Sequence, residues 1–257
     1  MLVLLSCAKT MSAVSKVKVP LTTIPRFQKE AAEIALQMSQ FSVDELERLL
    51  RVNAKIAVEN YKRYQAFHAE TTPELPALLA YTGIVFKRLN PKDFSAEDFG
   101  YAQEHLRLTS FCYGLLRPLD VIRAYRLGGD GVLPELGNQT LFSYWRSRLT
   151  DTFIEDIRSA GGILCNLASD EMKSLFDWKR VESEVRVVTP EFHVWKNGKL
   201  ATIVVYTKMS RGEMTRFILK NKIGNPEELK GFSWEGFEFD ESLSDERKLV
   251  FINGMGE

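Results

Sequence analysis

Residues 94–126, FSAEDFGYAQEHLRLTSFCYGLLRPLDVIRAYR, predict a helix that packs against a core and then gives way to extended structure. Ser95 is a favourable N-cap, and the acidic residues of the first turn suit the positive end of the helix dipole. Phe99, Ala102 and Leu106 recur at spacings of three and four, so they share one apolar face. The stretch therefore predicts an amphipathic helix that is buried on one side.

The second half of this stretch concentrates polar side chains around a break in the chain. Leu115 and Leu116 form a short apolar run, and Pro118 cannot continue a regular hydrogen-bonded element. Side chains suited to anion binding or hydrogen bonding fall close together: Arg107, Tyr113, Arg117, Asp120, Tyr125 and Arg126. We predict that this segment contributes to a polar site.

At these residues the chain resembles a known family. Residues 97–126 are similar to the signature of the YaaA family of bacterial peroxide-stress-response proteins. Three other landmarks of that family have counterparts in the same order: MLVLLSCAKT at 1–10, NLASDE at 166–171 and SRGEMTRFILKN at 210–221. The resemblance covers essentially the whole chain. It implies a role under hydrogen peroxide in limiting free intracellular iron and oxidative DNA damage, and DNA binding through a helical hairpin in a basic cleft.

Composition places the chain among ordinary soluble globular proteins. It has 257 residues, 45% hydrophobic and 26% charged, with a net charge of zero, so a nucleic-acid partner would need a local basic patch. Three cysteines and three histidines, all far apart, argue against a disulfide framework or a dedicated metal site. No apolar run reaches the roughly 20 residues of a membrane span. We predict a cytoplasmic, monomeric protein without metal or cofactor.

The hydrophobic patterns predict one mixed α/β domain over residues 1–257, with a mixed sheet, an N-terminal helical insertion and C-terminal hairpins. Helices are predicted at 26–38, from 43, at 54–67, at 141–160 and from 210. Strands are predicted at 2–5, 78–86, 163–167 and 185–188. Hairpins are predicted at 192–206, with a type I′ turn at Asn197-Gly198, and from strands 234–239 and 248–252.

Two of the predicted strands run into polar loops. Strand 2–5 is followed by Ser6, Lys9 and Thr10, and strand 163–167 contains Asn166 and is followed by Ser169. Ligands of α/β folds usually lie at the carboxyl ends of strands, and a buried asparagine needs hydrogen-bond partners. A plain loop exit and a capped helix start explain the same residues, so both interpretations stay open.

Residues 42–67 are a candidate helix-hairpin-helix. Ser42 and Glu45 form a capping box, and Asn53 interrupts two short helices, where we expect it to take a left-handed turn conformation. The predicted DNA-binding residues are Arg48, Arg51, Asn53, Lys55, Lys62 and Arg63. The usual glycines of such a hairpin are missing, so a plain helical hairpin with a solvated basic face is the alternative. Hairpins of this kind hold the phosphate backbone without reading bases.

A second basic group is predicted at a strand-to-helix junction, where Ser210 and Glu213 form another capping box. Together with the polar loops this group predicts an anion pocket lined by Lys9, Arg117, Tyr125, Arg126, Asn166, Lys208, Arg211 and Arg216. Candidate catalytic residues in that pocket are Ser6, Lys9, Asp120 and Ser169, although no nucleophile with a paired base can be assigned. A solvated basic helix start is the alternative.

The leading functional prediction is a DNA-associated stress protein that binds double-stranded or structured DNA without sequence specificity. The alternative is an enzyme of unknown reaction that acts on a phosphorylated or nucleotide-like ligand in the anion pocket. An iron-binding protein is a third and less favoured possibility, because ligand-type residues do not cluster in the sequence.

Overall fold

The computed structural model describes residues 1–196 and 198–254, and an eight-stranded mixed sheet runs through it. The sheet has the order β11-β12-β9-β8-β1-β3-β4, with β10 also pairing with β9. Its strands are β1 (Leu2–Leu5), β3 (Leu106–Ser110), β4 (Gly114–Leu116), β8 (Ile163–Asn166), β9 (Arg186–Lys196), β10 (Lys199–Ala201), β11 (Phe237–Asp240) and β12 (Lys248–Asn253). The predicted fold class is therefore confirmed.

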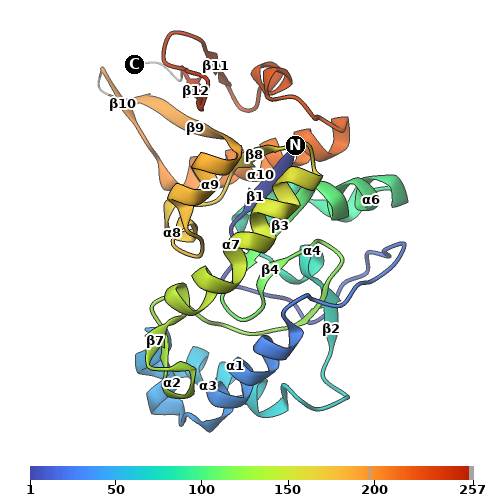
Figure 1. Cartoon of the computed structure of the whole chain (residues 1–257), viewed down its shortest axis with the longest axis vertical. Helices are drawn as coiled ribbons and strands as arrows, with labels where there is room; N and C mark the ends of the chain where they lie inside the picture. The colour runs from blue at the N-terminus through green and yellow to red at the C-terminus, as the bar shows by residue number, and fades with distance from the viewer. Residues whose placement is uncertain (197, 255–257) are drawn as a thin grey trace.

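The strand β1 lies inside the sheet, between β8 and β3 (Figure 1). It is parallel to β3 and β8, with Val3 opposite both Leu106 and Cys165. All four residues of β1 are fully buried, as expected for a parallel strand covered on both faces. The helices α6 (Ala96–His105) and α7 (Leu141–Ser159) pack against this central part.

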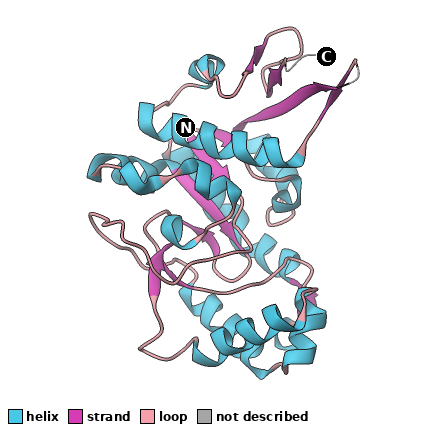
Figure 2. Ribbon diagram, turned by 180° about the vertical axis from the view of Figure 1, so that it is seen from behind, coloured by secondary structure: helices cyan, strands magenta, loops and turns pink. Residues whose placement is uncertain are grey.

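Three helices gather at one end of the long axis, and the β11–β12 hairpin lies at the other (Figures 1 and 2). They are α1 (Gln28–Gln40), α2 (Val43–Leu50) and α3 (Ala54–Ala66). The remaining helices are α4 (Ala77–Ala80), α5 (Ile84–Leu89), α8 (Asp170–Lys173), α9 (Trp178–Glu184), α10 (Val204–Asn221) and the 3-10 turns η1 (Pro91–Asp93), η2 (Pro134–Leu136) and η3 (Pro226–Gly231). Two small sheets pair β2 (Glu74–Pro76) with β5 (Val121–Arg123) and β6 (Val132–Leu133) with β7 (Gln139–Thr140).

The helix predicted after Ser95 is confirmed as α6, and its capping box is complete. The Ser95 side chain accepts a hydrogen bond from the Asp98 N–H, and the Asp98 carboxylate accepts one from the Ser95 N–H. The same carboxylate accepts from Lys220 at 2.8 Å and Lys222 at 2.5 Å, which ties the start of α6 to the end of α10.

The strand predicted at 78–86 is wrong, because this segment forms α4 and α5 on either side of Gly83. Short apolar runs suit a buried helix as well as a buried strand, so periodicity alone does not separate them. Gly83 is required by close packing: an added Cβ would lie 2.8 Å from the Cβ of Ala8. The segment thereby brings α5 against the loop that follows β1.

The end of the strand and the start of the helix predicted between 200 and 210 are also wrong. The strand β10 ends at Ala201 and α10 begins at Val204, so Ser210 lies inside the helix and is fully buried. The predicted turn includes Asn197, which lies outside the described residues, while β9 and β10 on either side of it pair antiparallel as expected. The closing hairpin of β11 and β12 is confirmed.

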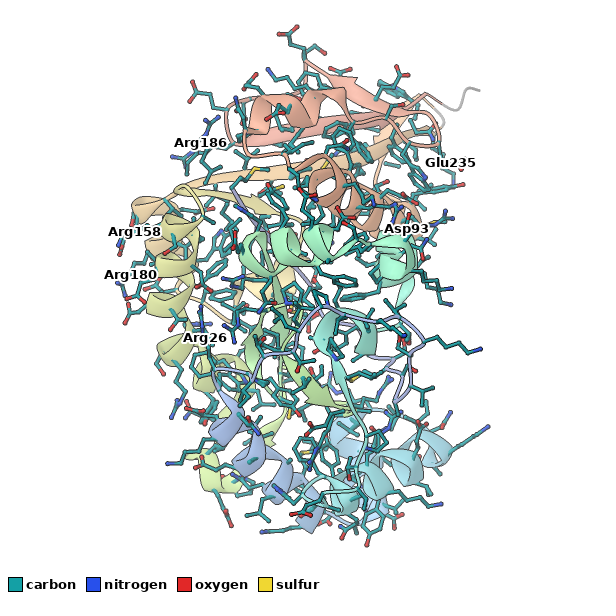
Figure 3. All side chains as sticks on the ribbon, turned by 90° about the vertical axis from the view of Figure 1, so that its right-hand side faces the viewer. Arg26, Asp93, Arg158, Arg180, Arg186 and Glu235 are labelled. Carbon is teal, nitrogen blue, oxygen red and sulfur yellow. The ribbon has the colours of Figure 1, made fainter. Side chains whose placement is uncertain are left out.

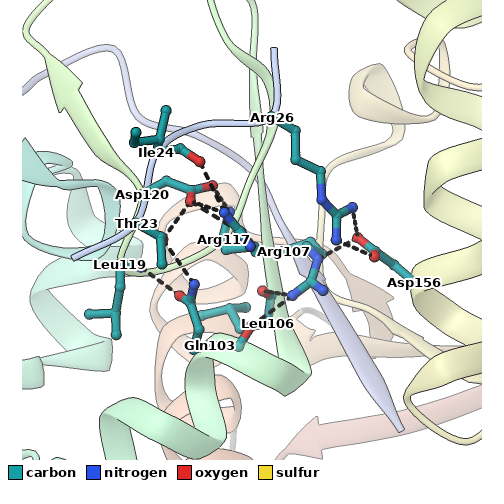
Figure 4. A network of polar contacts seen from close by, with 10 residues as sticks. All are labelled: Thr23, Ile24, Arg26, Gln103, Leu106, Arg107, Arg117, Leu119, Asp120 and Asp156. Carbon is teal, nitrogen blue, oxygen red and sulfur yellow. Dashed lines mark hydrogen bonds and ion pairs between the residues drawn. The ribbon is translucent and has the colours of Figure 1, made fainter. Parts of the chain in front are cut away.

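Ion pairs hold the helical layers to each other. Asp156 of α7 accepts hydrogen bonds from Arg107 of β3 at 2.6 Å and from Arg26 at 2.8 and 2.9 Å, in the network drawn in Figure 4. On one side of the molecule, Arg158 and Arg180 both pair with Glu184 of α9 (Figure 3). The first network is buried, whereas the second is exposed and contributes less per pair.

Candidate functional site

A cavity of about 520 Å³ opens at the carboxyl ends of β1 and β8. Its walls come from parts of the segments 5–10, 49–51, 83–86, 125–131, 167–172 and 208–211, together with Phe111. Because β1 and β8 are parallel neighbours, their following loops leave the sheet at the same edge and meet there. The topology thus brings together segments that lie far apart in the sequence.

The two strand-end loops are joined by serine hydrogen bonds. The Ser169 N–H donates to the Ser6 hydroxyl oxygen at 2.9 Å, and the two hydroxyl oxygens lie 3.2 Å apart. Both serines line the cavity, as the strand-end prediction implied. Among the described residues neither serine bonds to an imidazole or a carboxylate, so this arrangement does not supply a general base to a serine nucleophile.

The cavity has an excess of positive charge. Its cationic lining residues are Lys9, Arg51, Arg126, Lys208 and Arg211, and its acidic ones are Asp130 and Glu171. Among the described residues only Arg51 of this group forms an ion pair, a 3.8 Å contact with Asp130 in which both side chains are largely exposed. Arg126 donates to the Lys9 carbonyl at 3.2 Å. An excess of cations without matching carboxylates favours an anionic ligand.

Arg211 is the most constrained of these cations. Its Nε is buried and has no hydrogen-bond partner within the described residues. Burial lowers the pKa of the guanidinium, and the Asp170 charge raises it by less. The Asp170 carboxylate is itself exposed and bonded to Lys173 at 2.8 Å. Arg211 thus faces the cavity with little local compensation.

A chain of hydroxyl groups lies behind the cavity wall. The Tyr125 hydroxyl is 2.7 Å from the Ser110 hydroxyl and 2.8 Å from that of Tyr81, and all three residues are buried. Burial raises the pKa values of both tyrosines well above their usual range. Tyr125 therefore lines the cavity as predicted, but its hydroxyl bonds to the interior and stays protonated at neutral pH.

Cys7 also lines the cavity, and its environment disfavours the thiolate. Burial raises the pKa of this thiol to about 11, and the hydrogen bond with Thr109 lowers it by less. A thiolate is the reactive form of cysteine, so Cys7 is suited to packing and not to nucleophilic chemistry.

The candidate helix-hairpin-helix borders the cavity through the last residues of α2. The expectation that Asn53 takes the left-handed conformation is wrong: Arg51 does so, with φ of 51°, and Asn53 is the N-cap of α3. The oxygen of the Asn53 side chain accepts from the Ile56 N–H, which uses its best acceptor locally. Placing Arg51 in the turn leaves its side chain 81% exposed beside the cavity.

The other predicted DNA-binding residues differ in their freedom. Arg48, Lys55 and Lys62 are exposed on the surface of the hairpin. Arg63 instead bonds to Glu59 at 2.5 Å and to the Asn60 side chain, so its charge is already paired. Among these cations, the exposed ones thus outnumber Arg63, whose charge is paired within the hairpin.

Four residues predicted for the pocket or its chemistry lie outside the cavity lining. Arg117 pairs with the fully buried Asp120 at 2.8 Å, which also accepts from Thr23, so this pair anchors the loop before α1. Arg216 forms a two-pronged pair with Asp93 and so fastens α10 to η1.

Asn166, the fourth of these residues, is buried at the end of β8. Its side-chain oxygen accepts from the Ala168 N–H, and its Nδ2 has no partner within the described residues. The amide therefore shapes the turn that carries Ser169 toward the cavity.

Several lining residues were not predicted from the sequence. Residues 83–86, residues 128–131, Leu49, Leu50 and Phe111 all contribute to the walls. The sequence feature that could have indicated residues 83–86 is the Tyr81-Thr82-Gly83 turn, because a glycine between two apolar runs often marks a close backbone approach.

Comparison with known proteins gives a consistent result. The family described as "Peroxide stress protein YaaA" matches residues 1–243. A protein of Bacteroides thetaiotaomicron named UPF0246 protein is 98% identical over the full length of both chains, and one of Bacteroides fragilis is 77% identical over the full length of both. A UPF0246 protein of Saccharophagus degradans is 34% identical and covers 98% of each chain.

Two searches of the described residues bear on possible ligands and location. Residues 1–196 and 198–254 hold no group of three or more His, Cys, Asp or Glu side chains that could bind a metal ion. Within the same residues, every helix is too short or too polar to cross a bilayer.

Proposed function

The chain belongs to the YaaA family of peroxide stress proteins, and we propose that it acts in peroxide stress by binding DNA through the α2–α3 turn and the rim of the cavity. The observation that carries this proposal is the position of Arg51. Its left-handed conformation presents it at the tip of the hairpin, and it lines the cavity together with four other cations. The hairpin and the cavity therefore form one continuous basic surface.

This surface suits the phosphate backbone and not the bases. Arg48, Arg51 and Lys55 lie at or near the turn and are exposed, so their flexible side chains can follow phosphates on either side of a groove. The chain as a whole has zero net charge, which confines the attraction to this local patch. Binding of this kind is sequence-independent and weakens as salt rises.

DNA binding of this type has a physical connection to oxidative damage. Lysine and arginine side chains that neutralise phosphates release the cations condensed on the duplex, and Fe²⁺ is one such cation. Iron displaced from the backbone no longer generates radicals next to the bases. In this proposal the protein limits oxidative DNA damage where it covers the duplex, and the limitation of free intracellular iron that the family resemblance implies is a separate activity, because displacement from DNA does not remove iron from solution.

The proposal is tested by fluorescence anisotropy with a labelled duplex at several salt concentrations. The test variant is the double charge reversal Arg51→Glu/Lys55→Glu. The matched control, Lys179→Glu/Arg186→Glu, reverses one lysine and one arginine that are exposed on α9 and β9, outside the hairpin; Arg186 is labelled in Figure 3. Each lost phosphate contact should reduce the slope of log K against log salt by about 0.9, so the test variant should lose roughly 2. Unchanged affinity and slope in the test variant would remove the hairpin from the proposal.

The second candidate function is an enzyme that uses the cavity. It is favoured by the convergence of four cations around one cavity, none of which has a carboxylate partner among the described residues: Lys9, Arg126, Lys208 and Arg211. On this hypothesis Lys9→Ala or Arg126→Ala abolishes protection of peroxide-treated cells while folding and duplex binding persist. Full protection by both variants would exclude a catalytic role for these two side chains.

A further inference from the structure

We propose that the inner part of the cavity is a binding site for a phosphate monoester of about nucleotide size, with the phosphate held by Arg211, Lys208 and the Ser6–Ser169 pair. This inference goes beyond DNA-backbone binding, because a monoester carries up to two charges and can enter the cavity as a chain end or a free molecule. It concerns side chains of the strand-end loops and α10, and it does not rest on the hairpin.

The guanidinium of Arg107 in the same chain provides a comparison for that of Arg211. Arg107 is buried, and its Nε bonds to the Asp156 carboxylate at 2.6 Å, whereas Arg211 is half-buried. The Arg211 Nε is buried without any partner within the described residues. Leaving a buried donor unsatisfied costs desolvation free energy. Unlike Asn166, whose Nδ2 is also without a partner, Arg211 lines the cavity, so a ligand can complete its hydrogen bonding.

The second argument is that Arg211 cannot withdraw from this position. The next residue, Gly212, packs so closely on α5 that an added Cβ would lie 2.3 Å from the Val85 carbonyl oxygen. Ser210 on the other side is fully buried. The backbone of α10 is therefore fixed against α5, which itself lines the cavity, so the Arg211 side chain starts from a fixed point at the cavity wall.

The third argument is the chemistry of the neighbours. Lys208 precedes Arg211 by three residues on the same helix, so both charges share one face. The charge of Asp170 acts on Arg211, and Asp170 directly follows Ser169, which places the serine pair close to the guanidinium. A planar guanidinium, an ammonium and rotatable hydroxyls together match the oxygens of a phosphate monoester.

The fourth argument gives the size of the ligand. A phosphate group alone would leave most of a 520 Å³ cavity empty, whereas ligand pockets of this volume commonly enclose a small organic molecule. Apolar and aromatic side chains make up much of the remaining wall, including Leu50, Phe86, Phe111, Leu127 and Met172. These side chains suit a flat ring system attached to the phosphate.

The test uses isothermal titration calorimetry of the full-length protein with adenosine 5′-monophosphate and with adenosine. Wild type should bind the monophosphate and not the nucleoside. Arg211→Met and Lys208→Met should each weaken binding by about 10- to 100-fold, the effect of losing a charge-assisted hydrogen bond. The matched control is Arg216→Met, which removes an arginine of the same helix that is paired with Asp93 outside the cavity, and it should bind as wild type. Absence of binding by wild type at about 10 mM, or unchanged binding by Arg211→Met, would overturn the proposal.

A stability measurement separates a ligand site from a structural arginine. Replacing an unpaired buried cation by an apolar side chain of similar length should leave the melting temperature unchanged or raise it. A loss of stability in Arg211→Met greater than that in Arg216→Met would show that the guanidinium supports the fold, and it would overturn the assignment.

The source of the phosphate is resolved with short duplexes that do or do not carry a 5′-phosphate. If 5′-phosphorylation strengthens binding in an Arg211-dependent way, the monoester is a DNA end; if only the free nucleotide binds in that way, it is a small metabolite, and both results support the site. Duplex binding by Arg51→Glu/Lys55→Glu tests the hairpin, and adenosine 5′-monophosphate binding by Arg211→Met tests this site. Either proposal can therefore fail while the other holds.

Discussion

The buried ion pair of Asp156 provides the sharpest test of the fold. Its carboxylate accepts hydrogen bonds from Arg107 at 2.6 Å and from Arg26 at 2.8 and 2.9 Å (Figure 4). The substitution Asp156→Ala removes all three and leaves the Arg107 charge buried. Removing one partner of a buried pair costs about 3–5 kcal/mol. Arg107 keeps bonds to the carbonyls of Gln103 and Leu106, so we expect the lower end, about 3 kcal/mol.

The assay is urea unfolding followed by circular dichroism at neutral pH, with Asp93→Ala as the control. Asp93 forms an equally short pair with Arg216, but its side chain is 56% exposed, so its loss should cost at most about 1 kcal/mol. The double variant Arg107→Met/Asp156→Leu should recover much of the stability lost in Asp156→Ala, because no charge remains buried. Equal losses in Asp156→Ala and Asp93→Ala would refute the reasoning.

The same pair predicts a dependence on pH. Burial raises the pKa of Asp156, but the hydrogen bonds from Arg107 and Arg26 outweigh it and hold the pKa below its usual value. Stability from this group is therefore complete above the unfolded pKa of about 3.9 and is lost as pH falls through the folded value. When pH is lowered from neutral to this acidic range, the free energy of unfolding should fall by more in wild type than in Asp156→Ala.

Two further predictions concern the cavity and its support. Cys7 has a pKa of about 11, so it should resist peroxide and iodoacetamide in the folded protein at pH 7.5 and react after unfolding in urea. Mass spectrometry measures the modification, and equal modification of Cys7 in both states would contradict its assigned environment. Gly212→Ala should lower the free energy of unfolding by about 1–3 kcal/mol, because it forces α10 away from α5. The control Gly100→Ala in α6, where an added Cβ meets nothing within 4 Å, should raise it by about 0.5–1 kcal/mol. If thermal unfolding gives both changes the same sign, the α5–α10 contact is not limiting.

The sequence predicted correctly those structural features that form between residues close together in the chain. The N-cap predicted at Ser95 and the capping box predicted at Ser42 are confirmed, because each joins residues three positions apart. The pattern at Ser210 and Glu213 is the same, yet Ser210 is an interior residue of α10. Packing of Gly212 against Val85 decides that helix, and a contact across more than a hundred residues leaves no local signal.

The same distinction explains which site residues were predicted. Ser6, Lys9 and Ser169 follow strand ends, Lys208 and Arg211 lie within α10, and the topology brings all five into one cavity. Arg216 belongs to the same basic cluster in sequence, but Asp93 neutralises it from a segment 123 residues away.

Arg117 was misplaced for a different reason. Its partner Asp120 is only three residues distant, so this ion pair was available to a local argument that favoured an anion pocket. A carboxylate three residues from a cation can neutralise it locally, which makes that cation a structural residue before it can be a ligand site.

Short ion pairs therefore separate the structural arginines of this chain from those that line the cavity. Arg107, Arg117 and Arg216 each meet a carboxylate within 2.8 Å, and each lies outside the cavity lining. Arg211 and Arg126 line the cavity and form no ion pair with described residues. A fold gains no stability from cations kept without partners, so their retention around one volume is best explained by an anionic ligand. Arg51 lies where that volume meets the hairpin, which makes it the residue through which a bound phosphate and a bound duplex would influence each other.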